Sequence, residues 1–255
     1  MKAKHIALFL LVFVGLATIS STAQESITLR LHPQSDLTYN VEWKETTLVQ
    51  NRAIRVNVTN EFNQDLTVKD ASETQTEIEA LVKSIKAQTT TPMRIGNVSY
   101  DSEHPRRNNR DLAKQYDPLL NEAFTVIYDE LGNTVKDLSE PFGDMLSKVY
   151  MHVFIQLPEE KISVGSQWSF ETPKSYIVWN YTVTSISDQS VEVSFIGNLD
   201  NKDGMNGEIE GTASIHPQTG MVTRSNSTST ITMKDASQPF PSTIEMSTDI
   251  TVKEI

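Results

Sequence analysis

The histidines of this chain form no recognisable catalytic or metal-binding motif. None of them stands at the spacing of zinc ligands, as in HExxH. The nucleophile motif GxSxG and the phosphate-binding motifs GxGxxG and the P-loop are also absent. We therefore interpret the four histidines after the N-terminal segment as structural or exposed groups and expect a protein that is not an enzyme and uses no cofactor: His32, His104, His152 and His216.

Two polar stretches could bind ions. The stretch 200–206 collects several oxygen-bearing side chains, but Lys202 occupies a position where an EF-hand has a ligand. Its ordinary interpretation is a hairpin loop, and a calcium site is the alternative. Arg106, Arg107 and Arg110 form a basic cluster that suggests a solvated linker, or a contact with an anionic partner. Neither stretch is assigned as a metal site.

Several aromatic residues lie in phase with aliphatic residues on expected strands. Packing in the core is one explanation. The alternative is a wide curved sheet whose concave face binds an apolar ligand. On that alternative, the residues that we predict to line the ligand site are Trp43, Trp179 and Tyr181.

The elements that must position these aromatic residues are strands. Apolar and polar residues alternate over 37–43, 54–68, 177–183, 191–199 and 244–252. Period-two alternation predicts antiparallel strands with one face on a core and one face in water. We predict a mainly β fold, built as a large curved antiparallel sheet or half-barrels.

The segment 76–86 fits two patterns. Ile78, Leu81, Val82 and Ile85 have helical spacing, but alternation from Thr74 to Val82 favours a strand. We predict a strand in which a bulge near Leu81 absorbs the change of face.

The middle of the chain carries the expected helices. One spans 109–122, with Pro118 splitting it, and a second runs from Pro141 to Ile155 behind the N-cap candidate Ser139. Between them, 124–135 is predicted as a hairpin that turns at Gly132.

The chain also resembles itself weakly. LTVKDAS at 66–72 is similar to ITMKDAS at 231–237. We interpret this as two strand-rich pseudo-repeats, 24–105 and 156–255, joined by a helical connector, 106–155. Together they form a single β-rich domain, 24–255.

The first 23 residues have the pattern of a secretory signal peptide. Lys2 and Lys4 precede an apolar run, and Ser21-Thr22-Ala23 supplies small residues for cleavage. The chain contains no cysteine, which excludes disulfides, thiolate metal sites and lipoprotein acylation. The expected location is therefore the periplasm or the extracellular space, without a lipid anchor and without a transmembrane segment in the mature chain.

The formal net charge of −11 becomes −13 when Lys2 and Lys4 are removed with the signal. A negative field repels nucleic acid, so we expect no nucleic-acid partner.

Four short motifs resemble a family of secreted bacterial proteins, a domain of unknown function. They are IGNVSYDSE (95–103), DELGNTVKDLSE (129–140), the stretch from Leu157 through VGSQW (164–168), and HPQTGMV (216–222). The resemblance covers most of the mature chain in the family's order. It implies an exported β-rich protein and carries no catalytic residue.

Three functions are compatible with these observations. The first is a non-catalytic envelope protein that binds an apolar or lipid-like ligand in a sheet groove. The second is a structural protein that pairs with another envelope protein. An enzyme that uses scattered acidic residues is the third, because sequence alone does not show which carboxylates converge.

Overall fold

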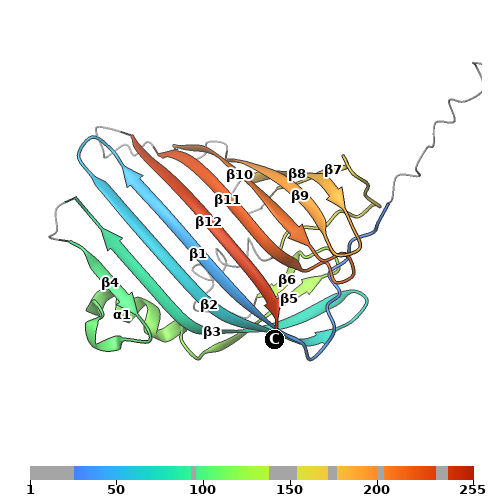
Figure 1. The fold of residues 1–255 in the computed structure, drawn as a ribbon, viewed down its shortest axis with the longest axis horizontal. Coiled ribbons are helices and arrows are strands. Elements are labelled where there is room, and N and C mark those ends of the chain that lie inside the picture. The colour runs from blue at the N-terminus through green and yellow to red at the C-terminus, as the bar shows by residue number, and fades with distance from the viewer. Residues whose placement is uncertain (1–25, 93–95, 138–153, 172–176, 200–203, 234–240) are drawn as a thin grey trace, which may run out of the picture.

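The computed structural model describes residues 26–92, 96–137, 154–171, 177–199, 204–233 and 241–255. They form a single 12-stranded antiparallel sheet in the order β6-β5-β3-β2-β1-β12-β11-β10-β9-β8-β7, with β4 paired to β3 (Figure 1). The strands are β1 Thr38–Gln50, β2 Arg55–Ala71, β3 Gln75–Thr90, β4 Val98–Asp101, β5 Ala123–Asp129, β6 Thr134–Asp137, β7 Gln167–Glu171, β8 Ile177–Ile186, β9 Val191–Leu199, β10 Met205–Ile215, β11 Val222–Met233 and β12 Ser242–Glu254. The predicted large antiparallel sheet is confirmed.

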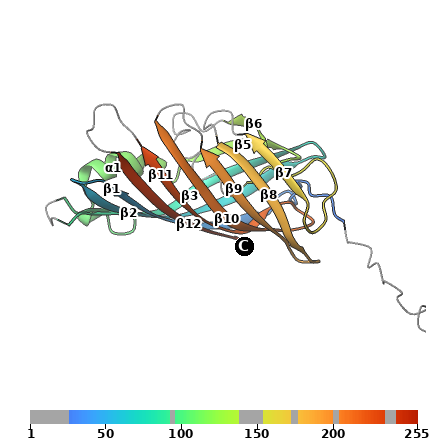
Figure 2. The ribbon, with the colours of Figure 1, turned by 90° about the horizontal axis from the view of Figure 1, so that it is seen from above.

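One face of the sheet, here called the inner face, carries the core. Alternate residues along each strand are buried on it, as Val41 and Trp43 are on β1, while their neighbours Glu42 and Lys44 are exposed. This is the period-two pattern expected of an antiparallel sheet with one wet face. Figures 1 and 2 show the strands as one continuous curved surface.

The bulge predicted near Leu81 is confirmed two residues further on. Pairing shifts between Asn63/Ser84 and Gln64/Val82, so Lys83 is the extra residue on β3. The shift moves the buried positions from Val82 to Ile85 and keeps both on the inner face. A helix over this segment is therefore excluded.

The first expected helix is shorter than predicted. Helix α1 covers Arg110–Tyr116, with the Asn109 side chain capping its first turn, and continues as a 3-10 turn, η2, over Asp117–Leu119. Pro118 lies in that turn, which explains why the α-helix stops before it. Two arginines of the basic cluster, Arg106 and Arg107, lie in a 3-10 turn, η1, over Pro105–Arg107.

The second expected helix, 141–155, lies outside the described residues except for its last two positions, as do the signal segment and most of the stretch 200–206. None of the helices in the described part of the chain is long and apolar enough to cross a membrane. The hairpin predicted at 124–135 is confirmed as β5 and β6.

The expected pseudo-repeats are not confirmed. LTVKDAS lies where β2 meets the β2–β3 turn, whereas the described part of ITMKDAS lies at the end of β11, at the opposite end of the sheet. Each strand follows a neighbour on its β7 side, but three antiparallel pairings separate β2 from β11, so the two strands run in opposite directions. A simple duplication along the sheet therefore does not relate them.

One end of the sheet is tied together by two bridging segments, 26–33 and 154–164. Leu31 N–H donates to Glu130 O (2.7 Å) and His32 N–H donates to Thr219 O (2.9 Å). These acceptors lie in the β5–β6 and β10–β11 turns, and four strands (β3, β2, β1 and β12) separate the two hairpins in the sheet. We call this the bridged end. The opposite end, which carries the 51–54 turn, is called the far end.

Candidate functional site

The structure places all three predicted ligand-lining residues on the inner face, but in two separate groups. Trp43, Trp179 and Tyr181 are 7%, 6% and 5% exposed. Trp43 lies on β1, and the other two lie on β8, with β12, β11, β10 and β9 between them. They therefore do not form one aromatic pocket.

The first aromatic group surrounds Trp43. Its ring lies 4.9 Å from that of Phe62 on β2, and Phe62 in turn makes an edge contact with Tyr116 of α1 at 6.2 Å. Tyr116 also lies 5.2 Å from Tyr100 on β4. Tyr116 of α1 thus contacts β2 and β4, and burial together with the charge of Glu45 raises the pKa of Tyr116.

The second group surrounds Tyr181. Its ring stacks on Trp168 at 5.0 Å and lies 6.1 Å from Phe195. Trp179 meets Phe195 edge-on at 5.7 Å. Burial raises the pKa of Tyr181, so the phenol stays neutral at physiological pH.

Two glycines let this second group lie flat against the sheet. A Cβ added to Gly197 would come within 2.7 Å of the Trp179 ring, and one added to Gly211 within 2.5 Å of the Phe195 ring. Each ring therefore covers a glycine on the next strand. Between the two aromatic groups, the inner face carries small and aliphatic side chains.

Small hydroxyl side chains line the inner face of β11 and its neighbour β12. Ser225, Ser227 and Ser229 on β11 and Thr248 on β12 are all buried. The sequence did not reveal these residues, because β11 reads RSNSTST and has polar side chains on both faces. Alternation, the main signal for an inner face, is missing there.

Four buried polar atoms on adjacent strands have no hydrogen-bond partner among the described residues. They are Gln64 Nε2 on β2, Trp43 Nε1 on β1, Thr248 Oγ1 on β12 and Ser229 Oγ on β11. We call these four residues the polar diagonal. Native proteins satisfy most buried polar groups, so a run of four calls for an explanation.

Strand register shows how the polar diagonal is arranged. Gln64 on β2 pairs with Val41 on β1, and Trp43 lies two residues further along β1. Trp43 in turn pairs with Ile250 on β12, and Thr248 lies two residues from Ile250. Thr248 pairs with Ser227, two residues from Ser229. Each step moves one strand across the sheet and two residues toward the far end, a diagonal that separates neighbouring Cβ atoms by about 7–8 Å.

Beyond the polar diagonal, the far end of the inner face is aliphatic and only half-buried. In one row, Ile231 pairs with Ile244, Ile244 with Val49, and Val49 with Val56. In the next, Met246 pairs with both Ser229 and Thr47, and Thr47 pairs with Val58. We call the half-buried members of these rows the aliphatic patch: Val49, Val56, Val58, Ile231, Ile244 and Met246.

A carboxylate lies between the polar diagonal and Asn60. Glu45 pairs with Thr248 on one side and Asn60 on the other. Its Oε1 accepts a hydrogen bond from Thr47 Oγ1 at 3.2 Å, and Asn60 Oδ1 lies 3.5 Å from the Tyr116 hydroxyl. The middle of the inner face is therefore polar, between an aliphatic far end and an apolar bridged end.

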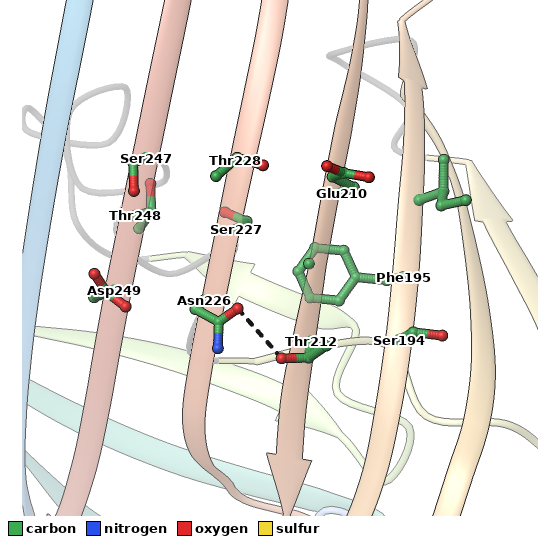
Figure 3. A pocket seen from close by; sticks show the side chains of 12 residues that line it. Ser194, Phe195, Glu210, Thr212, Asn226, Ser227, Thr228, Ser247, Thr248 and Asp249 are labelled. Atoms are coloured by element: carbon green, nitrogen blue, oxygen red, sulfur yellow. Dashed lines mark hydrogen bonds between the residues drawn. The ribbon is translucent and has the colours of Figure 1, made fainter.

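The outer face offers a shallow hollow of about 570 Å³ across β9–β12 (Figure 3). Exposed polar side chains surround it, including Glu210 and Asp249, and Thr212 Oγ1 donates to Asn226 Oδ1 at 3.3 Å. Its floor is the strand backbone around Gly211 and Ser227. A hollow as open as this one, ringed by carboxylates and hydroxyls, is a poor site for an apolar ligand.

Asp101, Glu103 and His104 form a cluster that the histidine spacing did not suggest. Asp101 Oδ1 accepts from Glu103 N–H, and Oδ2 lies 2.9 Å from His104 Nδ1. Burial acts to raise the pKa of Asp101, but the hydrogen bonds from His104 and Glu103 outweigh it and lower the pKa. These bonds are those of a capped surface turn, and they account for the cluster without a metal.

No protein-family model matches the chain, and no curated protein matches it. Among solved structures, it is similar to lipovitellin, in a structure of lipid–protein interactions, with a TM-score of 0.65 at 8% identity. The match covers 86% of this chain and 25% of the lipovitellin chain, so this chain spans about a quarter of that protein. This similarity shows a shared fold.

Two further matches have much lower TM-scores. An outer membrane channel from Pseudomonas putida F1 has a TM-score of 0.28 at 9% identity, with 88% of this chain and 98% of that chain covered. The translocator domain of an autotransporter from Neisseria meningitidis has a TM-score of 0.27 at 7% identity, with 87% and 90% covered. At these scores, neither supports an argument about this chain.

Proposed function

We propose that this protein is a non-catalytic, exported binding protein that holds an apolar or lipid-like ligand against the inner face of its sheet. The observation that carries the proposal is the aliphatic patch. Six aliphatic side chains on four adjacent strands stay half-buried, whereas the same face is fully buried at the bridged end. A contiguous apolar surface that is not fully buried favours a ligand.

The fold supports this proposal in a second way. The lipovitellin structure concerns lipid–protein interactions, and this chain shares that fold over most of its length. We extend lipid binding to this chain because the aliphatic patch lies on the inner face of the shared sheet. Export rests on the signal-like segment 1–23, which would leave a mature protein starting at Gln24.

Binding of N-phenyl-1-naphthylamine, a neutral apolar fluorophore, tests the proposal. We expect saturable binding to the mature protein, and native mass spectrometry of protein from its own envelope should show a co-purifying ligand. Ile244→Ala should weaken binding of the probe about threefold or more, because it removes buried methylene groups from the contact. Ile196→Ala is the matched control, since Ile196 is 45% exposed on the outer face of β9.

The control variant should bind the probe as the unchanged protein does. Equal weakening by Ile196→Ala and Ile244→Ala would place the probe outside the inner face. Failure of the unchanged protein both to bind the probe and to carry a ligand would reject the proposal and favour the protein-pairing alternative.

A further inference from the structure

We infer that the ligand is a neutral amphiphile, a long-chain alcohol or acyl ester, whose oxygen is bound by the polar diagonal while its chain lies on the aliphatic patch. This inference rests on the proposed function and specifies the chemistry of the ligand. Its basis is the combination of buried polar atoms that have no hydrogen-bond partner within the described part of the chain and adjacent half-buried aliphatic side chains on the same face.

Burial makes the unpartnered atoms informative. Gln64, Trp43, Thr248 and Ser229 are 1%, 7%, 2% and 6% exposed, so water at the surface does not satisfy them. A buried polar group without a partner costs free energy, about 1–3 kcal/mol for each group. One ligand oxygen can reach only neighbouring members of the diagonal, so we assign its hydrogen bonds to Trp43 and Thr248, the two members in the middle.

The identity of the four groups sets the chemistry of the ligand. The indole Nε1 of Trp43 and the amide Nε2 of Gln64 are donors only, whereas the hydroxyls of Thr248 and Ser229 both donate and accept. The matching ligand atom is an acceptor oxygen, as in an alcohol or an ester. None of the four groups carries a charge, so the diagonal itself offers no counter-ion for an ionised head group.

Strand register sets the orientation. The diagonal ends at Ser229, which pairs with Met246, and the aliphatic patch continues from there to the far end through Ile231 and Ile244. From Thr248 to Ile244, β12 advances four residues, about 13 Å, which matches the length of a chain of about ten carbons. The ligand would therefore lie with its oxygen toward the middle of the sheet and its chain toward the far end.

Competition between matched compounds tests this inference. Displacement of N-phenyl-1-naphthylamine is measured with 1-dodecanol, methyl dodecanoate and dodecane, delivered in the same carrier. We expect the two oxygen-bearing compounds to compete at least about fivefold better than the hydrocarbon, as one or more hydrogen bonds predict.

Isosteric variants test whether the ligand oxygen is bound by the polar diagonal. Thr248→Val keeps the shape and removes the hydroxyl, and Trp43→Phe keeps an aromatic ring and removes Nε1–H. Each should reduce binding of 1-dodecanol about fivefold while leaving dodecane unchanged. Thr228→Val is the control, since Thr228 is exposed on the outer face of β11. Thr248→Val keeps the test decisive even where Trp43→Phe folds poorly.

The outcomes separate this inference from the proposed function. Equal competition by dodecanol and dodecane, with both variants unchanged, would overturn the inference and leave apolar binding intact, because water would then be the partner of the diagonal. No probe binding at all would overturn both. A loss confined to the oxygen-bearing compounds in Thr248→Val and Trp43→Phe would support the inference.

Discussion

The bridged end and the far end of the inner face are built from the same strands, yet they differ in packing. At the bridged end, Leu29, Leu66 and Ile215 are fully buried, and the segments 26–33 and 154–164 hydrogen-bond to the turns. At the far end, aliphatic residues on the same face are half-buried. We conclude that the bridged end supplies more of the stability of the sheet than the far end does.

Leucine and isoleucine truncations at the two ends give the largest expected contrast. Leu66→Ala should lower the free energy of unfolding by about 3–5 kcal/mol, because it leaves a cavity in a fully buried site. Ile244→Ala should cost about 1 kcal/mol, since its side chain is already half-exposed. Denaturant melts of both variants, without ligand, check this. Equal losses would show that the far end is as firmly packed as the bridged end.

Glycines with positive φ give the next contrast. Gly220 has φ of 66°, and an added Cβ would come within 2.3 Å of Arg30 O in the bridging segment. Gly165 has φ of 88°, with no atom within 4 Å of an added Cβ. Gly165→Ala should therefore lower the free energy of unfolding by only about 1 kcal/mol, the cost of holding a residue with a Cβ in the left-handed conformation. Gly220→Ala should lower the free energy of unfolding by about 3 kcal/mol, because the backbone at Arg30 must also move to make room for the Cβ.

Thermal and denaturant melts of the two glycine variants measure this difference. Similar losses of stability in the two variants would mean that the segment 26–33 shifts at little cost. The contact between Gly220 and this segment would then contribute little to the stability of the bridged end. A larger cost at Gly220 would show that the contact with Arg30 is part of what holds the end together.

Sequence patterns predicted the sheet well because each buried strand shows its own alternation. They located β3 and its bulge, since the change of parity between Val82 and Ile85 is visible in the residues themselves. They also predicted the hairpin of β5 and β6 from the turn at Gly132. These features depend on local physics, which a single sequence contains.

The candidate site was predicted only in part. Trp43, Trp179 and Tyr181 were correctly expected on the inner face, because they alternate with aliphatic residues. Their separation into two groups depends on the pairing of β1 with β12, which joins segments about 200 residues apart and leaves no local signal. Thr248 and Ser229 were missed, because hydroxyl side chains occupy both faces of β11 and of part of β12.

Two buried threonines on the inner face give the smallest and most specific contrast. Thr76 and Thr248 are 0% and 2% exposed, and both can be changed to the isosteric valine. At the bridged end, Thr76 Oγ1 donates to Leu31 O at 3.3 Å and so joins β3 to the bridging segment. Thr76→Val should cost about 1 kcal/mol, since it removes this bond and leaves a buried carbonyl with one partner fewer.

Thr248→Val should behave in the opposite way in protein freed of ligand. Its hydroxyl has no partner among the described residues, so valine removes an unsatisfied group and keeps the volume. The variant should be as stable as the unchanged protein, or up to about 1 kcal/mol more stable. Denaturant melts of delipidated protein measure both threonine variants. A clear loss of stability in Thr248→Val would show that the hydroxyl is already satisfied within the protein, and the polar diagonal would no longer require a ligand.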